Sequence, residues 1–432
     1  MNYQQALDFL YGLQIFGIKL GLRNITKTLR EIDDPHDSFR AIHIAGTNGK
    51  GSTAALVESV LRAAGWKTGL FTSPHLFDFT ERIRVNGRPI PHRRVSEGVS
   101  LLRPFVERYR CTFFEAVTAL AFHHFREEEV DVAVVEVGMG GRLDATNVIS
   151  PVCTIITDID NDHTEYLGST LTSIAQEKAA IVKENGLVIT SVTDPDILDT
   201  VESVCRKREA ALYTTATHCS LTASEVTSEG SWVDFRAPFR SYTGVRLPLV
   251  GRHQLRNCEA ALLAIDVMNG DGFAVTEPQV KEGIAGTVWP GRLHVLQKEP
   301  LFVVDGAHNV GGMLALKAAL QELFPYDSLI LVLGVMANKN YGAMVKAIVP
   351  MAREVVVTRP RMDRALECGL LAEEVKTITS HFHVVDSIPE AVERAFQLAG
   401  SNDAVCAAGS LFLVGEILKE RCGSVDVLFS LH

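Results

Sequence analysis

Short apolar runs rich in β-branched residues alternate along this chain with longer stretches of helical periodicity, and no other feature constrains the fold as much. The run at 41–45 precedes a helical pattern over 50–64. Runs at 130–137 and 152–157 come next, and a helical stretch at 171–182 follows the second of them. This alternation is typical of parallel sheets that are covered by helices. We therefore predict an α/β fold.

The pattern changes further along the chain. Between 211 and 249 the segments become short and alternating, as in antiparallel strands or hairpins. A helical pattern and the break Trp289-Pro290-Gly291 follow, after which the alternation of strands and helices resumes. We predict one unit at 1–288 with a mostly parallel sheet plus a small antiparallel subsheet, a linker at 289–296, and a smaller Rossmann-like, doubly wound unit at 297–432.

The composition excludes several classes of protein. With 432 residues, 47% hydrophobic and 22% charged, the chain is of globular type and long enough for two or more domains. A net charge of −10, without a block rich in lysine or arginine, argues against nucleic-acid binding. The longest apolar stretch, at 329–337, is much shorter than the roughly 20 residues of a membrane span. Eight scattered cysteines without a Cys-x-x-Cys pair indicate reduced thiols. We expect a cytoplasmic protein with no membrane or nucleic-acid partner.

The sharpest local motif is a glycine-rich loop between the first predicted strand and the first predicted helix. Its residues are Gly46, Thr47, Asn48, Gly49, Lys50, Gly51 and Ser52. Glycines let backbone N–H groups turn toward an oxyanion, the helix start adds partial positive charge, and Lys50 adds a full charge. The spacing departs from the common P-loop, because Ile44 replaces the outer glycine and Gly51 separates Lys50 from Ser52. The loop predicts nucleotide binding and a P-loop ATPase-like N-terminal unit, with a glycine-rich turn bearing an exposed lysine as the alternative.

Three polar residues at the ends of predicted strands in the same half are candidate ligands for Mg²⁺, the ion that accompanies nucleotide phosphates. Ser73 follows an apolar pair, Glu136 ends the run at 132–135, and His163 lies just past another apolar run. A buried carboxylate such as Glu136 needs a positive partner. Taken singly, each also fits an ordinary role: a turn serine, an ion-paired glutamate and a solvated histidine.

Two further features accompany these candidates. Gly138, Gly140 and Gly141 come soon after Glu136, so that a substrate could approach the backbone closely, although a tight corner explains them equally well. Lys178 belongs to a helical pattern and by itself fits a solvated helix lysine.

The second unit offers candidates at two strand-to-helix junctions and at the linker. Asp305 could hold a ribose hydroxyl and His308 a phosphate or a substrate carboxylate, with a capped helix start as the alternative. Arg292 could bind a phosphate across the gap between the domains or form a structural ion pair. Ser410 lies at a junction that repeats the geometry of an anion site.

Together these motifs resemble the folylpolyglutamate synthase/dihydrofolate synthase family, within the Mur-type ligases. The matches extend from Gly21-Leu22 to Gly415-Glu416 and so cover nearly the whole chain. Besides the loop at 46–52 they comprise 72–76, 81–83, 86–87, 136–147, 163, 177–178, 251–254, 257, 290–292, 305–309 and 409–416. One departure is Asn338-Lys339-Asn340, where the family often has Asp-Lys-Asp.

The resemblance implies ATP- and Mg²⁺-dependent amide formation between a folate or pteroate carboxylate and the amine of L-glutamate, through an acyl phosphate. It implies ATP binding by the loop 46–52, Asn257, Arg292 and Asp305, and Mg²⁺ binding by Ser73, Glu136 and His163, with a monovalent cation as a further candidate. It implies catalytic roles for Lys50, Lys178 and His308, and a carbamate on Lys178. The pterin would lie near Gly21, Thr112, Phe114, Leu143, Asp144 and Ala145, and the incoming glutamate near His308 and Ser410. The partners are then small molecules, and the family suggests a monomer.

We predict a bifunctional enzyme that adds glutamate to dihydropteroate and to tetrahydrofolates, because Asp144 and its loop are compatible with the first step. The alternatives are chain extension alone, a Mur-type ligase that joins an amino acid to another carboxylate, and a non-enzymatic nucleotide switch. The match at 141–147 favours a folate substrate. A switch has no need of Lys178 or of the motif at 305–309.

Overall fold

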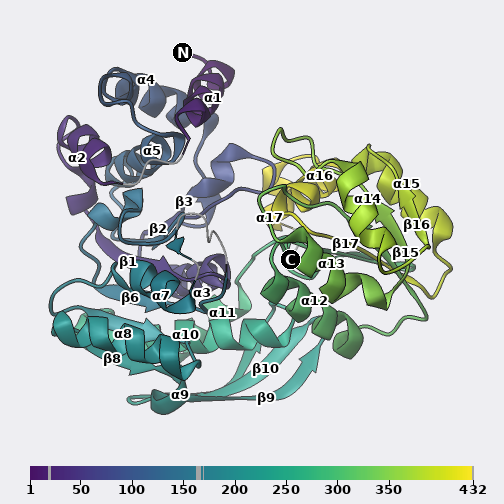
Figure 1. Ribbon diagram of the computed structural model, residues 1–432. Helices are drawn as coiled ribbons and strands as arrows, with labels where there is room; N and C mark the ends of the chain where they lie inside the picture. The colour runs from purple at the N-terminus through teal and green to yellow at the C-terminus, as the bar shows by residue number, and fades with distance from the viewer. Residues whose placement is uncertain (18–20, 162–166, 169, 431–432) are drawn as a thin grey trace.

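The computed structural model describes residues 1–17, 21–161, 167–168 and 170–430 (Figure 1). The N-terminal half contains an eight-stranded sheet in the order β4-β3-β2-β5-β1-β6-β7-β8. The parallel strands are β1 (Arg40–Ala45), β2 (Thr68–Phe71), β5 (Val132–Glu136), β6 (Cys153–Ile156), β7 (Leu187–Thr190) and β8 (Ala211–Thr214). At one edge, β3 (Ile83–Val85) and β4 (Arg88–Pro89) pair antiparallel.

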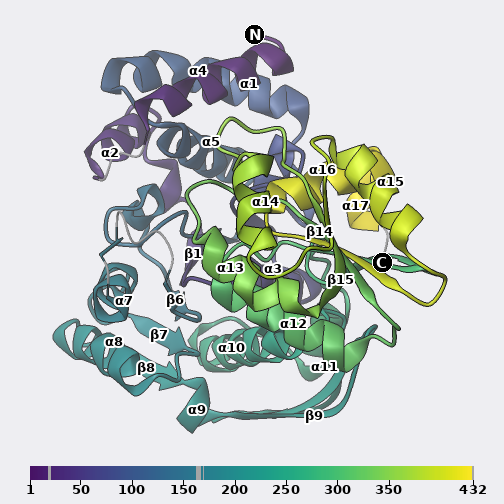
Figure 2. The same ribbon diagram turned by 45° about the vertical axis from the view of Figure 1, so that its right-hand side comes forward.

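Helices cover both faces of this sheet. Successive side chains of a strand point to opposite faces, so a central strand contributes to two hydrophobic clusters. In β5, Val132 and Val134 belong to one hydrophobic cluster, and Ala133 and Val135 to another. The first cluster lies beneath α3 (Lys50–Ala63), α10 (Arg252–Met268) and α11 (Glu277–Ala285). The second lies beneath α1 (Tyr3–Gly12), α2 (Arg23–Arg30), α4 (His92–Tyr109) and α5 (Phe113–Glu127), which Figure 2 shows together at the N-terminal end. Helices α7 (Leu171–Ala179) and α8 (Pro195–Lys207) connect β6, β7 and β8.

The predicted antiparallel subsheet is present, with a different start. It consists of β9 (Ser220–Thr227), β10 (Gly230–Arg236) and β11 (Ser241–Leu247), and a short helix, α9 (Thr215–His218), precedes it. The segment 211–214, which we expected to be antiparallel, instead forms β8 and pairs in parallel with β7. The pattern misled us because β8 is a short, partly buried strand at the sheet edge and lacks the continuous apolar run of a central parallel strand.

The C-terminal half contains a six-stranded sheet in the order β12-β13-β17-β14-β15-β16. Its strands are β12 (His294–Lys298), β13 (Leu301–Asp305), β14 (Leu329–Leu333), β15 (Ala352–Val357), β16 (Phe382–Val384) and β17 (Ala404–Ala408), parallel except for β12. Its helices are α12 (Val310–Leu323), α13 (Tyr341–Ile348), α14 (Cys368–Lys376), α15 (Ile388–Leu398), α16 (Leu411–Cys422) and α17 (Val425–Ser430). The predicted fold class is confirmed. The domain boundaries stay predictions, and β12 begins within the range that we assigned to the linker.

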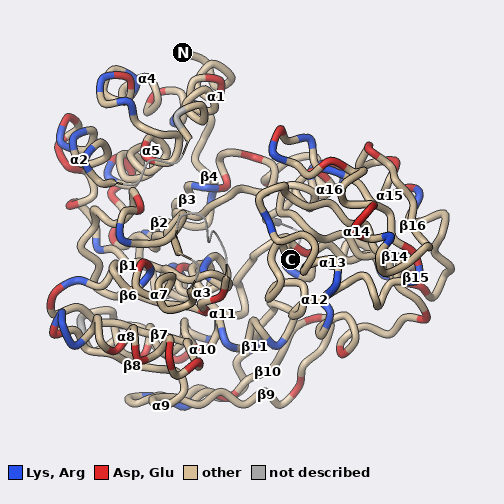
Figure 3. The backbone as a smooth tube through the Cα atoms, in the orientation of Figure 1, with Lys and Arg blue, Asp and Glu red and all other residues tan. Residues whose placement is uncertain are grey.

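Lysine, arginine, aspartate and glutamate residues are interspersed over both halves of the molecule (Figure 3). Among the described residues, no helix combines the length and the apolar character needed to cross a bilayer. All eight cysteines are free thiols.

Candidate functional site

A cavity of about 340 Å³ lies where β1, β5 and β6 end at the carboxyl edge of the larger sheet. β5 and β6 flank β1 on opposite sides, so the strand order reverses at this point. Open α/β sheets bind their ligands at such a reversal. The cavity is lined by these predicted site residues: Gly46, Thr47, Asn48, Gly49, Lys50, Gly51, Ser52, Ser73, Glu136, Lys178, Asn257, Arg292, Asp305 and His308. Segments that are far apart in the sequence therefore meet at one place.

Two glycines of the loop between β1 and α3 are required by its backbone and its packing. Gly46 and Gly49 have φ angles of 154° and 86°, which residues with a side chain rarely adopt. A Cβ atom on Gly46 would lie 1.8 Å from Thr157 Oγ1, and one on Gly49 would lie 2.2 Å from Asn257 Oδ1. Thr157 Oγ1 also donates to the Asn48 carbonyl at 2.7 Å. The loop is therefore held tightly between the end of β6 and α10.

A pair of opposite charges, a partly buried lysine and a buried glutamate, lies beside this loop. Lys50 Nζ donates to the carbonyls of Gly46 and Thr47 at 3.1 and 3.2 Å and lies 3.9 Å from Glu136 Oε1. Glu136 is 5% exposed, and its Oε2 accepts from the Ser73 N–H at 3.0 Å. Burial raises the pKa of Glu136, and the nearby cation Lys50 opposes that rise. Burying the ionised carboxylate of Glu136 therefore costs free energy, and Lys50 and the Ser73 N–H offset part of that cost.

Lys178 is buried at the phosphate loop, so the solvated role that we considered for it is wrong. It lies in the last turn of α7, is 5% exposed, and donates from Nζ to the Gly46 carbonyl at 2.8 Å. The glycine loop after β5 packs on the same helix, because a Cβ on Gly141 would lie 2.5 Å from the Glu177 carbonyl. The third predicted metal ligand, His163, lies outside the described residues.

The C-terminal sheet supplies the opposite wall of the cavity. Asp305 ends β13, and its two carboxylate oxygens accept from the N–H groups of Ala307 at 2.7 Å and Leu293 at 2.8 Å. His308 donates from Nδ1 to the Gly306 carbonyl at 2.8 Å, which places the proton of a neutral ring on Nδ1. Asp305 thus organises the turn that carries His308, which agrees with the capped helix start considered as the alternative. Both residues also line the cavity.

Arg292 lies between carboxylates of the two halves. Burial lowers the pKa of Arg292, whereas the charges of Asp305 and Glu136 raise it. Its guanidinium lies so close to Gly306 that a Cβ there would be 1.9 Å from Nη1. The arginine is therefore packed across the gap between the two sheets, with its charge balanced from both sides.

The start of α12 contacts the phosphate loop directly. Asn309 Nδ2 donates to Asn48 Oδ1 at 2.9 Å, while Asn309 Oδ1 accepts from Gly312 N at 2.8 Å and caps the helix. A Cβ on Gly311 would lie 2.5 Å from Asp160 Oδ2. The two halves are therefore in close contact at the cavity.

On the polar face of α10 only Asn257 was expected in the site, although His253 belongs to the matched motif 251–254. His253 and Arg256 line the cavity together with the predicted Asn257, and Asp158 does so from the end of β6. Burial lowers the pKa of His253, which the charge of Asp305 opposes. The signal was available, because polar residues at positions 253, 256 and 257 recur with the spacing of one helix face.

The residues predicted for the pterin lie beyond the glycine loop and do not line this cavity. The Phe114 ring covers Gly138, where a Cβ would lie 2.4 Å from Cζ of the ring. Thr112 caps α5, and Gly21 has open space around its Cα. Asp144, between Leu143 and Ala145, is buried and accepts from Met139 N at 2.9 Å and from Thr146 N and Oγ1 at 3.0 and 2.5 Å. Burial raises the pKa of Asp144, and these hydrogen bonds oppose the rise.

Ser410 has a local structural role. It is 1% exposed, and its Oγ accepts from Phe412 N at 3.1 Å as the N-cap of α16. Its neighbour Leu411 lines the cavity, whereas Ser410 is not among the described residues that do.

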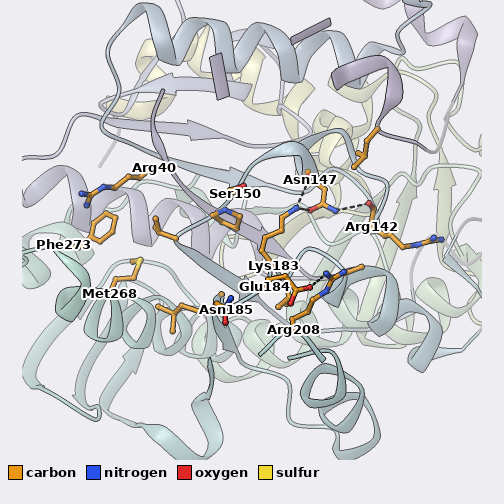
Figure 4. A pocket seen from close by; sticks show the side chains of 17 residues that line it. Arg40, Arg142, Asn147, Ser150, Lys183, Glu184, Asn185, Arg208, Met268 and Phe273 are labelled. Atoms are coloured by element: carbon orange, nitrogen blue, oxygen red, sulfur yellow. Dashed lines mark hydrogen bonds and ion pairs between the residues drawn. The ribbon is translucent and has the colours of Figure 1, made fainter. Parts of the chain in front are cut away.

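A second hollow, of about 1060 Å³, lies at the amino ends of β1, β6 and β7 and contains none of the predicted site residues. It is lined by the basic residues Arg40, Arg142, Lys183 and Arg208. Arg142 pairs with Glu177 and Arg208 with Glu184, Arg40 lies over the rings of Trp66 and Phe273, and Lys183 donates to Asn147. Figure 4 shows these side chains pointing in different directions. Their charges do not converge on a common point.

Comparison with known proteins agrees with this geometry. The model of the Mur ligase middle domain matches residues 44–265, and that of the Mur ligase glutamate ligase domain matches residues 291–411. A dihydrofolate synthase/folylpolyglutamate synthase of Bacillus subtilis is 34% identical over 427 residues, which cover 96% of this chain and 98% of that protein. The chain belongs to the folylpolyglutamate synthase/dihydrofolate synthase family of Mur ligases.

Solved structures of the folylpolyglutamate synthase/dihydrofolate synthase family superpose on nearly the whole chain. Folylpolyglutamate synthase of Mycobacterium tuberculosis, complexed with ADP and AMPPCP, has a TM-score of 0.91 at 29% identity and covers 97% of this chain and 99% of its own. Escherichia coli FolC in complex with DHPP and ADP has a TM-score of 0.85 at 27% identity, with coverages of 96% and 97%. Two archaeal relatives are longer, and the chain spans 50% and 51% of them. As a member of this family, the protein is an ATP-dependent ligase that forms C–N bonds.

Proposed function

We propose that this protein joins L-glutamate to the carboxylate of dihydropteroate and of tetrahydrofolates, and so acts as a bifunctional dihydrofolate synthase/folylpolyglutamate synthase. The observation that carries the proposal is one cavity that unites the phosphate loop, the ion pair Lys50–Glu136 and the loop 305–308 of the other sheet. The names of the B. subtilis and E. coli relatives support the choice of substrates.

The donor set beside the loop fits Mg²⁺. Glu136 is a buried carboxylate and Ser73 a hydroxyl, both lining the cavity, and oxygen donors are what this ion prefers. Ser73, Glu136 and His163 would hold it, and when bound it supplies positive charge against the phosphates of ATP. The described residues contain no group of three histidine, cysteine or acidic side chains arranged for a metal ion.

The chain's own groups have separate tasks in the reaction. A carboxylate resists attack by an amine because it has no good leaving group, and transfer of the ATP γ-phosphoryl group to it supplies one. Lys50 and the N–H groups of the loop would hold the phosphoryl oxygens, and Arg292 would stabilise their charge from the other side. Lys178 would carry a carbamate, formed when its neutral amine attacks CO₂ and loses a proton. Asn257 and Asp305 would orient the nucleotide.

The second half of the reaction takes place at the C-terminal wall. The amine of glutamate attacks the acyl phosphate, a tetrahedral intermediate forms, and phosphate leaves. His308 would orient the glutamate, and Ser410 would act through the start of α16 that it caps. The contact between Asn309 and Asn48 supports a closed site that keeps water from the acyl phosphate.

The experiment that tests this function measures phosphate release from ATP with Mg²⁺ and L-glutamate, in parallel with dihydropteroate, tetrahydrofolate and no pterin. We expect release with both pterins and one glutamate gained per phosphate. Release with tetrahydrofolate alone would restrict the function to chain extension. No phosphate release with either pterin would indicate that the substrate is a different carboxylate. Phosphate release that does not depend on glutamate would favour a nucleotide switch. We expect the enzyme to be a cytoplasmic monomer, and its free thiols fit a reducing compartment.

The replacement Asp144→Ala tests the proposed pterin side. We expect it to raise the KM for dihydropteroate more than the KM for tetrahydrofolate, because Asp144 holds the loop 139–146 that would contact the pterin. The loss of three hydrogen bonds should also lower the melting temperature, so Asp144→Asn, which keeps most of them, is the matched variant. Equal effects of Asp144→Ala on the two substrates, at a temperature where the variant is folded, would refute a role of this loop in choosing the pterin.

A further inference from the structure

The phosphate loop departs from the common spacing at Gly51, and the structure gives a reason for this residue. Gly51 is the second residue of α3 and lines the cavity next to Lys50. A Cβ atom on it would lie 2.5 Å from Cζ2 and 3.1 Å from Cε2 of Trp289. The indole of Trp289 therefore rests on the backbone of the loop, in a space that any side chain at position 51 would fill.

Trp289 also lies close to a buried arginine. The guanidinium carbon of Arg84 lies 5.3 Å from the centre of the Trp289 ring and 3.8 Å from that of Phe429. Arg84 is 5% exposed, donates from Nε to the Glu81 carbonyl at 3.2 Å, and faces the charges of Glu81 and Glu58. Since Arg84 belongs to β3 and Phe429 to α17, this stack joins the larger sheet to the last helix of the chain.

The same stretch of chain that carries Trp289 also enters the cavity. Three residues later comes Arg292, between Glu136 and Asp305, and Gly291 is packed against Leu76. A Cβ on Gly415 of α16 would lie 1.9 Å from the Leu76 carbonyl, so α16 is pressed on the segment that follows Ser73. Trp289 is therefore joined by a short stretch of chain to Arg292 in the cavity, while its ring packs on the hydrophobic cluster beneath α3 and contacts the phosphate loop.

We infer that Trp289 and Arg84 are positioning residues for the phosphate loop. When α17 is docked, Phe429 packs on Arg84, Arg84 holds Trp289, and Trp289 fixes the conformation of the loop at Gly51. The nucleotide would then be bound tightly when the two halves are docked and more weakly when they are apart. The inference rests on the proposed binding of ATP at the loop 46–52. It assigns to Gly51 a function that differs from that of Gly46 and Gly49 in the same loop, since the backbone of Gly51 has no positive φ.

A double-mutant cycle on ADP affinity, measured by isothermal titration calorimetry with the full chain, tests the first contact. Gly51→Ala should weaken ADP binding by about tenfold, because the rigid indole must shift. In the Trp289→Ala background the same change should cost less than about twofold, because the obstacle is gone. Equal costs in both backgrounds would overturn the inference.

A second comparison tests the far end of the stack and does not require Gly51→Ala to fold. Phe429→Ala should raise the KM for ATP about fivefold and leave the KM for glutamate unchanged, because the loss acts through Arg84 on the loop. Val427→Ala is the control, since Val427 lies on the same helix and is 41% exposed. Trp289→Phe, which keeps a ring over Gly51, should retain a KM for ATP close to that of the wild type, in contrast to Trp289→Ala.

The outcomes separate this inference from the proposed function. If the wild type binds ADP and turns over but Phe429→Ala changes only the melting temperature, the stack is merely structural and the inference is wrong. If the wild type does not bind ADP, the proposed function fails, and the inference fails with it.

Discussion

Replacing Lys178 with alanine is expected to lower kcat by about 10³-fold, with ADP affinity within about threefold of the wild type. Lys178 Nζ is buried at the Gly46 carbonyl, in the wall of the cavity that would hold the phosphates. Nucleotide binding should persist, because the N–H groups of the loop and Lys50 remain. Steady-state kinetics and calorimetric titration of ADP give the two numbers.

Lys183→Ala is the matched control for this prediction. Lys183 lies five residues later, and its Nζ donates to Asn147 at 2.8 Å, next to the other hollow. We expect wild-type kcat in this variant. Full turnover of Lys178→Ala would remove Lys178 from the mechanism. Partial rescue of that variant by a short carboxylic acid, but not by an alkylamine, would identify the missing group as the anionic carbamate.

The local elements around the cavity could be predicted from the sequence because each is encoded within a few residues. The expected strand at 41–45 and helix at 50–64 agree with β1 and α3 to within one residue at each end. The glycines of the loop and the polar residues at strand ends marked the carboxyl edge of the sheet. Glu136 and Asp305 were found in this way, and both are buried in the cavity wall.

Contacts between distant segments could not be predicted in the same way. Nothing near Gly51 in the sequence indicates that Trp289 would lie on it, and nothing near Asn48 indicates Asn309. Such pairs depend on how two sheets pack, which the periodicity of either one does not specify. Ser410 shows a different limit of the sequence. A serine before a helix predicts a helix cap and an anion site equally well, and the structure shows the cap.

Burial was also underestimated where a charged side chain looked ordinary. Lys178 follows the helical pattern of a surface lysine, Arg82 was noted only as part of a motif, and Arg84 was not singled out, yet all three are at most 7% exposed. Polar residues are buried where partners compensate them, and the partners come from other elements. For Lys178 the partner is the Gly46 carbonyl, 132 residues away in the chain.

The second prediction with a large effect concerns Glu136→Gln, which should abolish most turnover without lowering stability. The amide is isosteric and can still accept from the Ser73 N–H, but it removes the negative charge that would bind Mg²⁺. We expect kcat to fall by about 10³-fold. Because burial raises the pKa of Glu136, its ionised form is destabilising near neutral pH. The melting temperature of Glu136→Gln, measured with EDTA, should therefore equal or exceed that of the wild type.

Glu58→Gln provides the contrast, since Glu58 is equally buried but lies on α3 away from the cavity. It pairs with Arg62 at 3.1 Å and accepts from Thr68 Oγ1 at 2.5 Å, so the amide should lower the melting temperature and leave kcat unchanged. The two buried carboxylates would then respond in opposite ways, one in activity and the other in stability. A lower melting temperature in Glu136→Gln would mean that Lys50 and Arg292 more than offset the cost of burying its charge. Retained turnover would mean that Glu136 is a structural partner of Lys50, and the metal would have to be held elsewhere.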